Sequence, residues 1–303
     1  MKERMVMKNI RFISLWVILL FVSNTLMAQE VKDTVKFWKT SGMGSLTFSQ
    51  VSFENWASGG ENSYTLNGIF SFQANYKKER VSWENSFDLG YGLVKQSGLG
   101  VRKSDDRLEV MSKYGYKTNS NWYYSGSFNF KTQFDKGYKY NEAEGTKRQI
   151  SDLMAPAYVM LSLGMDYKPG DAFSLMLSPL SGKTTIVLDD SLSARGAFGV
   201  KEEKHLRNEF GGFIKVSYNR DVWDNVTLNT KLDLFTNYLK EPQNIDVSWE
   251  VLISMKVNEY LSANLNTQLI YDDNINYVDR DGRVMGPRIQ FKEVFGAGLS
   301  YKF

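Results

Sequence analysis

The chain has 303 residues, no cysteine, and 37 basic against 34 acidic residues, which gives a formal net charge of +3. The absence of cysteine excludes a disulfide framework, and the near balance of charge gives no basis for nucleic-acid binding. A mean hydropathy of −0.37 excludes a bundle of membrane-spanning helices. It does not exclude a membrane β-barrel, because barrel strands present an apolar residue to lipid only at every second position.

The first residues predict an export signal. A basic start is followed by the apolar run Phe12–Val22, which is about eleven residues long and too short to span a bilayer. We place cleavage after Ala28, so that residues 1–28 form a signal peptide, 29–40 a periplasmic segment and 41–303 the barrel. An uncleaved anchor is the alternative, which the short apolar run disfavours.

Strand patterns then follow one another with no helical period. In 64–76, for example, Leu66, Phe70 and Phe72 alternate with polar residues, as in a strand between two different solvents. The expected strands lie at 44–53, 64–76, 81–93, 108–116, 122–134, 159–167, 173–177, 210–218, 226–238, 247–257, 261–271 and in the segment that ends at Phe303. This makes about twelve strands, and ten to fourteen fit the pattern.

The connections between these strands alternate between short and long. Short turns are expected at 77–80, 117–121, 168–171, 220–225 and 258–260. Long polar connections are expected at 54–63, 95–106, 135–156, 178–207, 239–246 and 272–288. Short periplasmic turns and long extracellular loops are typical of outer-membrane barrels, whereas a soluble sandwich has no reason to sort its loops in this way. The sequence therefore predicts an all-β fold, a transmembrane antiparallel barrel.

Aromatic residues of outward parity gather beside the short turns. They are Tyr76, Trp83, Tyr116, Trp122, Tyr167, Phe173, Tyr218 and Phe303. Amphipathic rings at this level indicate a girdle at the periplasmic face of the membrane. Asn85 and Glu293 do not fit the outward face, and for Glu293 we expect a place above the lipid or a β-bulge that resets the alternation.

Charged residues of both signs have inward parity. They are Glu84, Asp88, Arg107, Glu109, Lys113, Lys131, Lys215, Lys231, Asp233, Glu250 and Lys256. One interpretation is a network of ion pairs that fills a small lumen, and the other is a water-filled pore with weak charge selectivity. We favour a closed or narrow lumen, which the long 178–207 segment would constrict further by folding inward.

Few residues suggest chemistry. His205 is the only histidine, so a barrel enzyme acting on lipid or surface polymer would be built on it, but no serine or aspartate near it has a catalytic spacing. Asp272–Asp281 resembles a calcium loop, yet Tyr277 replaces the turn glycine and Arg283 the bidentate glutamate. We therefore expect no catalytic, cofactor-binding or metal-binding residues, no cofactor and no enzymatic activity, with a loose surface calcium site as the alternative.

Two stretches carry a family resemblance. FSQVSFENWASGGENS (48–63) and IQFKEVFGAGLSYKF (289–303) resemble a Bacteroidota family of outer-membrane β-barrels known as domain of unknown function 3078. The resemblance extends over nearly the whole mature chain and implies a Gram-negative outer-membrane location but no activity. Trp56 in the first stretch is expected to anchor at the membrane interface, or else to serve as a ligand platform.

These observations predict a non-enzymatic outer-membrane barrel that is a narrow channel or a scaffold for surface loops. The alternatives are an enzyme that uses His205 and an adhesin-like barrel whose loops bind a partner. The expected partners are outer-membrane lipid and the barrel assembly machinery, which would recognise the C-terminal strand ending in Phe303. We expect no nucleic acid as a partner, and the sequence does not identify a soluble partner.

Overall fold

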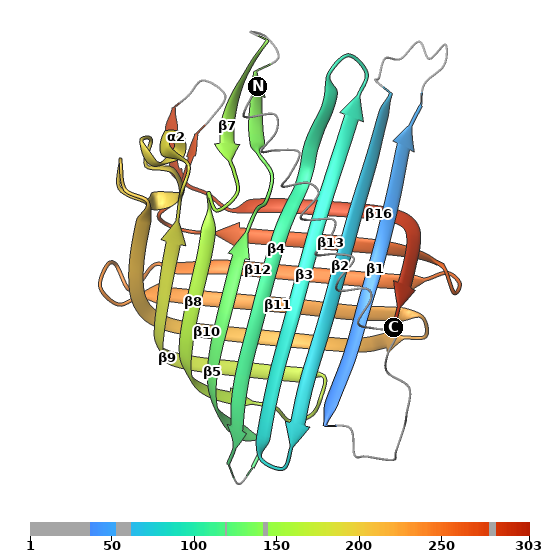
Figure 1. Cartoon of the computed structure of the whole chain (residues 1–303), viewed down its shortest axis with the longest axis vertical. Coiled ribbons are helices and arrows are strands. Elements are labelled where there is room, and N and C mark those ends of the chain that lie inside the picture. Colours follow the sequence, from blue (N-terminus) through green and yellow to red (C-terminus); the bar gives the residue numbers. More distant parts are fainter. Residues whose placement is uncertain (1–36, 53–61, 119, 142–144, 279–282) are drawn as a thin grey trace, which may run out of the picture. The chain divides into compact units, whose positions relative to one another are not determined.

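The computed structural model describes residues 37–52, 62–118, 120–141, 145–278 and 283–303, and within them twelve strands close into one antiparallel barrel (Figure 1). The predicted fold class and strand number are confirmed. Neighbouring strands pair in chain order, and β1 closes the wall by pairing with β16. In Figure 1 the front strands β1 to β4 cross the rear strands β11 to β13 steeply, as tilted strands on opposite walls of a barrel do.

The wall strands are β1 (Trp38–Val51), β2 (Ser63–Lys78), β3 (Val81–Gln96), β4 (Gly100–Lys117), β5 (Trp122–Thr132), β8 (Ala157–Tyr167), β9 (Phe173–Ile186), β10 (Leu206–Trp223), β11 (Val226–Asn237), β12 (Ile245–Lys256), β13 (Leu261–Tyr271) and β16 (Gln290–Lys302). The connections contain the hairpins β6 (Gly137–Asn141) with β7 (Thr146–Ser151) and β14 (Asn276–Val278) with β15 (Val284–Pro287), the helix α2 (Asp190–Ser193) and the 3-10 turn η2 (Ala197–Gly199). Among the described residues, no helix has the length and apolarity needed to cross a membrane. Strand β1 begins three residues before the expected barrel boundary at 41.

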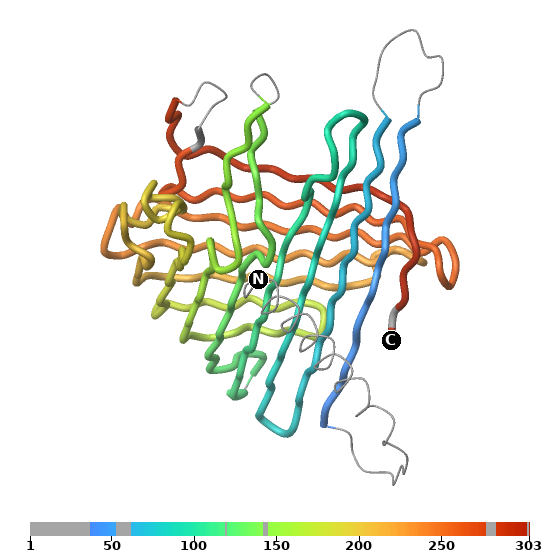
Figure 2. Tube along the Cα trace, turned by 45° about the horizontal axis from the view of Figure 1, so that its top comes forward, coloured from blue at the N-terminus to red at the C-terminus, as the bar shows by residue number. Residues whose placement is uncertain are grey.

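The connections sort by length as expected. Short turns at 79–80, 118–121, 168–172, 224–225 and 257–260 lie at one end of the barrel, which we call the short-turn end. The strand ends that flank the connections 52–62, 133–156, 187–205, 238–244 and 272–289 lie at the other, the long-loop end (Figure 2). The expected long connection at 95–106 is wrong, because β3 and β4 continue as a hairpin whose turn is only 97–99.

The expected loop 178–207 is also too long, since β9 continues to Ile186. The pairing of β8 with β9 shifts between Leu163 and Met165, where Gly164 faces two residues that include Pro179. Proline has no backbone N–H to donate to a ladder and is tolerated in a strand at a bulge. A Cβ at Gly164 would overlap the β9 backbone, so glycine makes room for this bulge.

The barrel wall is apolar outside and polar inside. Large exposed side chains on its outer face include Leu46, Phe48, Leu66, Phe70, Phe128, Leu161, Leu163, Leu180, Phe210, Phe295 and Leu299. The buried side chains of the strands are mostly polar or charged, among them Ser45, Glu109, Lys113, Ser125, Asp166, Ser181, Lys215 and Asn264. This inverts the arrangement of a water-soluble domain and matches a barrel wall between lipid and a polar lumen.

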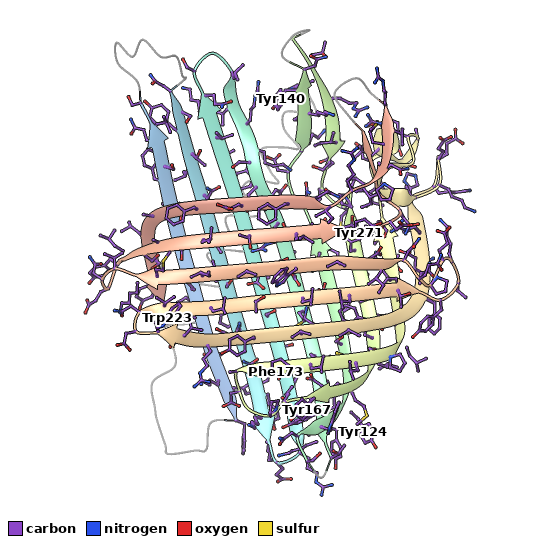
Figure 3. All side chains as sticks on the ribbon, turned by 180° about the vertical axis from the view of Figure 1, so that it is seen from behind. Tyr124, Tyr140, Tyr167, Phe173, Trp223 and Tyr271 are labelled. Carbon is purple, nitrogen blue, oxygen red and sulfur yellow. The ribbon has the colours of Figure 1, made fainter. Side chains whose placement is uncertain are left out.

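Aromatic rings cluster at the short-turn end, as predicted. The Trp38 ring centroid lies 5.3 Å from that of Tyr76 and 5.7 Å from that of Trp83. Trp122 and Tyr167 lie 5.0 Å apart across β5 and β8. Tyr124, Tyr167, Phe173 and Trp223 are seen along this end in Figure 3.

The two outward polar residues have different surroundings. Asn85 accepts a hydrogen bond from the Ser112 hydroxyl at 2.8 Å and donates to the Ala74 carbonyl at 3.2 Å, while the Trp83 indole donates to Ser112 at 2.8 Å. This outward polar group is therefore satisfied within the wall, which lowers its cost in an apolar solvent. Glu293 is exposed on the outer face of β16, and no register shift separates it from β13, so the expected bulge is wrong.

The seam between β1 and β16 has the shortest pairing in the wall, with six partnered positions from Met43 to Phe48. Two backbone hydrogen bonds between Gly42 and Phe303, of 2.8 and 3.0 Å, extend it. The Phe303 ring covers Gly42 so closely that a Cβ there would overlap it, and it stacks on Tyr301 at 6.1 Å. An aromatic ring over a cross-strand glycine restores the side-chain cover that the glycine lacks.

We therefore predict that Phe303→Ala destabilises the closed barrel by about 1 kcal/mol, the scale of an aromatic pair beyond its area burial. The measurement is the urea midpoint at which the folded band is lost in heat-modifiable gel migration. The control Phe291→Ala removes a ring of similar exposure from the other end of the same strand. Equal destabilisation by the two variants would contradict a special role for the seam contact.

Candidate functional site

Ion pairs cross the lumen at mid-height. Arg107 Nη1 on β4 lies 2.8 Å from Glu250 Oε2 on β12, and Lys231 Nζ on β11 lies 3.0 Å from Asp88 Oδ2 on β3. In both pairs five strands separate the partners in either direction round the closed wall. The partners therefore come from opposite walls, and their side chains meet in the middle of the lumen.

Further charged groups complete this level of the lumen. Lys131 Nζ lies 3.5 Å from both Glu109 and Asp233, and Lys215 Nζ lies 2.9 Å from Asp233. We call the eight residues Asp88, Arg107, Glu109, Lys131, Lys215, Lys231, Asp233 and Glu250 the mid-lumen layer. Its four cations balance its four carboxylates, and Glu109 is only 2% exposed.

A second layer lies nearer the short-turn end and consists of Glu84, Lys113, Asp166 and Lys168. Lys113 Nζ lies 2.7 Å from Asp166 and 3.1 Å from Glu84, while Lys168 pairs with Asp166 at 3.2 Å and also with Glu84. Asp166 is fully buried and Lys113 is 4% exposed. This lower layer is also neutral, with two cations and two carboxylates.

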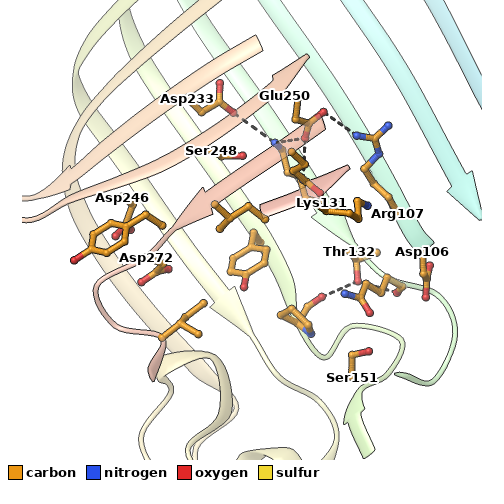
Figure 4. A pocket seen from close by; sticks show the side chains of 18 of the residues that line it. Asp106, Arg107, Lys131, Thr132, Ser151, Asp233, Asp246, Ser248, Glu250 and Asp272 are labelled. Atoms are coloured by element: carbon orange, nitrogen blue, oxygen red, sulfur yellow. Dashed lines mark hydrogen bonds and ion pairs between the residues drawn. The ribbon is translucent and has the colours of Figure 1, made fainter. Parts of the chain in front are cut away.

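A cavity of about 480 Å³ lies between the mid-lumen layer and the long-loop end (Figure 4). Arg107, Lys131, Asp233 and Glu250 of the mid-lumen layer line it, together with Ser248. Its other walls include Tyr158, Met160, Phe213, Phe235, Ile270 and Tyr271 from the strands, and Gln133, Tyr138, Ile150 and Ile275 from the long connections. Cavities in the mouth of a barrel, with apolar walls and a few polar groups, are common ligand sites.

Charged residues also gather on one side of the cavity near the long-loop end. Lys183 Nζ on β9 lies 2.6 Å from Asp246 and 3.3 Å from Asp272. Arg207 contacts Glu209 at 3.1 Å and Asp272 at 3.5 Å. Every cation in this cluster has a carboxylate partner.

Parity in the sequence identified most of these charges. Of the residues predicted to face inward, all but Lys256 belong to the mid-lumen or lower layer, and Lys256 lies exposed at the end of β12. Asp166 was missed although it alternates with Met165 and Tyr167 in a predicted strand. Lys183 was missed because the expected connection 178–207 covered the part of the chain where β9 continues.

His205 lies in the connection 187–205, away from the lumen layers. Its Nδ1 lies 2.8 Å from the Val187 carbonyl, to which it donates, and its Nε2 lies 3.7 Å from the Asp190 carboxylate. Both contacts of the ring within the described residues are thus to oxygen acceptors rather than to a serine hydroxyl. The arrangement is that of a half-exposed histidine in a capped loop.

No group of three or more histidine or acidic residues that could hold a metal ion is found in the described part of the chain. Asp272 instead pairs with Lys183, and Asp273 accepts a hydrogen bond from Asn244 at 2.6 Å. The rest of the calcium-like segment, at 279–282, lies outside the described residues, as does Trp56.

The connection 187–205 packs on itself at the long-loop end. Val187, Leu192 and Val200 form a buried apolar cluster with Ala155 of the 133–156 connection. Among the described residues, the cavity lining includes residues of the 133–156 connection but none of the 187–205 connection. This differs from the expectation that the long 178–207 segment folds inward and constricts the lumen. Asp189 caps helix α2, accepting hydrogen bonds from the Ser191 hydroxyl at 2.7 Å and the Leu192 amide at 2.9 Å.

Comparison with known families gives one match. Residues 48–138 match the model of a family described as "Protein of unknown function (DUF3078)". The matched segment includes the first stretch that carried the resemblance, 48–63, but not the C-terminal stretch 289–303, so it is shorter than expected. No curated protein matches the chain.

Several solved structures have a similar fold at low identity. An outer membrane channel from Pseudomonas putida is 16% identical, with 91% of this chain and 99% of that chain covered and a TM-score of 0.38. The translocator domain of the autotransporter NalP from Neisseria meningitidis is 9% identical, with 98% and 97% covered and a TM-score of 0.36. OmpT from Vibrio cholerae is 9% identical, with 91% and 100% covered and a TM-score of 0.32. The barrel assignment is based on the closed strand order of this chain itself.

The cap at Asp189 generates a prediction. The hydrogen bond from Ser191, with donation from the Leu192 amide and the Gln149 side chain, outweighs partial burial and lowers the pKa of Asp189 below its ordinary value. A carboxylate with a lowered pKa stabilises the fold above its unfolded pKa of about 3.9, and this stabilisation is lost as the pH falls through the folded value. Asp189→Ala should weaken helix α2 by about 1 kcal/mol.

The measurement is hydrogen exchange of the Leu192 amide, corrected for intrinsic rates, and we expect about fivefold faster exchange in Asp189→Ala at pH 7. Asp189→Asn keeps an acceptor, so it should retain most protection but lose the acid dependence. Lys201→Ala in the same connection is the control. Unchanged protection in Asp189→Ala would disprove the capping role.

Proposed function

We propose that this protein is a non-enzymatic barrel of a Gram-negative outer membrane, exported by the signal at residues 1–28, whose lumen is closed to free diffusion. It presents its cavity and long loops to the outside of the cell. On this proposal its wall contacts outer-membrane lipid, and the barrel assembly machinery recognises the strand that ends in Phe303. The resemblance further implies a Bacteroidota source, which stays a prediction.

Four features support the outer-membrane location. They are the apolar outer face, the aromatic rings at the short-turn end, the even number of strands and the separation of short turns from long connections. Together these are the properties of bacterial outer-membrane barrels. The short-turn end then faces the periplasm and the cavity opens toward the outside.

The closure rests on one observation, the pairing of opposite walls through Arg107–Glu250 and Asp88–Lys231. Side chains that meet from both walls narrow the lumen at mid-height, and the lower layer narrows it a second time. A barrel of this strand number lies between small filled barrels and open porins. The ion pairs across the lumen favour the filled class, so we propose a closed lumen rather than a porin.

The absence of enzymatic activity is part of the proposal. The contacts of His205 support this part of the proposal. Its Nδ1–H donates to the Val187 carbonyl, and its Nε2 faces the Asp190 carboxylate. A general base needs a hydroxyl or water of the substrate within hydrogen-bond reach and a nucleophile beside it.

Single-channel recording tests the closed lumen. The mature chain is refolded into a planar bilayer after heat-modifiable migration has verified the fold, and we expect no ohmic steps from it at neutral pH. The variant Arg107→Ala/Glu250→Ala/Lys113→Ala/Asp166→Ala truncates one pair in each layer while Glu84–Lys168 and Glu109–Lys131 stay paired. Removing both partners leaves no orphan charge, so the barrel should fold and conduct.

The matched control removes an exposed pair at the short-turn end, Lys77→Ala/Asp171→Ala, and should stay silent like the unaltered chain. Stable ohmic steps from the unaltered chain would overturn the proposal and make the protein a pore.

A further inference from the structure

Every basic side chain that lines the cavity is already paired with a carboxylate. Its five basic residues each contact a carboxylate: Lys103 with Asp106 at 2.8 Å, Arg107 with Glu250 at 2.8 Å, Lys131 with Asp233 at 3.5 Å, Lys183 with Asp246 at 2.6 Å and Lys292 with Asp105 at 2.6 Å. The sixth carboxylate of the lining, Asp272, pairs with Lys183 and Arg207. A charged ligand would therefore lose its hydration without finding a free counter-charge, which is costly in a partly buried site.

The cavity also has apolar side chains where the rest of the lumen is polar. Met160 on β8 and Ile270 on β13 are half-buried and face inward, and Phe213 pairs directly with Phe235 across β10 and β11. Phe213 and Phe235 are already buried, whereas half-buried side chains such as Met160 and Ile270 gain free energy when an apolar surface covers them. The apolar wall therefore favours a ligand with an apolar face.

Hydrogen-bonding groups alternate with these apolar side chains. Ser248 on β12 lines the cavity (Figure 4), as do the half-buried rings of Tyr158 and Tyr271. A paired carboxylate still has free lone pairs, so Asp233 and Glu250 can accept from a neutral hydroxyl without giving up their cations. Neutral hydroxyls thus fit where a charged group does not.

We propose that this cavity binds an uncharged, hydroxyl-bearing organic molecule with an apolar face, of the size of a small glycoside, which enters from the long-loop end. Its volume of about 480 Å³ lies within the usual range of small-molecule sites. The inference rests on the proposed function, because the mid-lumen layer must stay closed to form the floor of the site.

Thiol labelling tests this, because the chain contains no cysteine. Ser248→Cys places a single thiol of nearly unchanged size in the cavity wall, and Ser97→Cys places one at the exposed tip of the β3–β4 hairpin as the matched control. The full mature chain in lipid vesicles is treated with three methanethiosulfonates, carrying a neutral methyl, an anionic sulfonatoethyl or a cationic trimethylammonioethyl group. Each rate at residue 248 is divided by the rate of the same reagent at residue 97.

We expect the neutral reagent to label Ser248→Cys, and both charged reagents to be at least about tenfold slower in relative rate, because each ion is desolvated without a partner. The uncharged probe 4-nitrophenyl β-D-glucoside should slow neutral labelling of Ser248→Cys in a saturable manner and leave Ser97→Cys unaffected. Saturable protection at residue 248 alone would support a site in the cavity.

Three results would overturn the proposal. A charged reagent as fast as the neutral one would show that the cavity does not disfavour charge, and no labelling by any reagent would show that it is closed to the outside. Selective neutral labelling without protection by the glucoside would exclude the hydroxyl-bearing ligand. The labelling rate measures access to the cavity alone, whereas the bilayer current measures whether the lumen beneath it is closed. The two experiments therefore show separately which proposal fails.

Discussion

The ion pairs between opposite walls are the interaction on which the rest of the lumen depends. Arg107–Glu250 and Asp88–Lys231 each join strands that are diametrically placed in the closed wall. A buried pair of this kind contributes little compared with apolar packing of the same volume, but loss of one partner leaves an unpaired charge and costs about 3–5 kcal/mol. The pairs therefore specify the arrangement of the lumen more than they stabilise it. Each layer is neutral, so no excess charge resists the burial of residues such as Glu109 and Asp166.

The outer and inner faces of the barrel wall carry different kinds of side chain. The outer face carries large apolar side chains and aromatic rings at the short-turn end, and the seam there is covered by Phe303 lying on Gly42. The inner face carries the ion pairs across the lumen, and the cavity lies between them and the long loops. Their position along the strands is the basis of the proposed closed lower half and hollow upper half.

The barrel could be predicted from the sequence because side-chain alternation is set by strand geometry. Alternation and loop length together identified twelve strands and placed residues such as Glu109 and Lys231 inside. The extent of β4 and β9 could not be read, since polar outer halves of strands resemble loops and Pro179 is tolerated only through a bulge opposite Gly164. The ion-pair partners could not be predicted either, because side-chain alternation indicates that Arg107 faces inward but not that Glu250 lies opposite it. That depends on the strand order and the stagger of the closed wall.

A charge-swap cycle on Arg107 and Glu250 tests the central claim most directly. Arg107→Glu and Glu250→Arg each place like charges together, and each should lower the free energy of unfolding in urea by about 3–5 kcal/mol. The combined swap restores an opposite pair in the same place, so it should be less destabilised than the sum of the two single variants by about 2–3 kcal/mol. Strictly additive effects, with the swap as unstable as the two single variants together, would contradict the claim that these residues join the two walls.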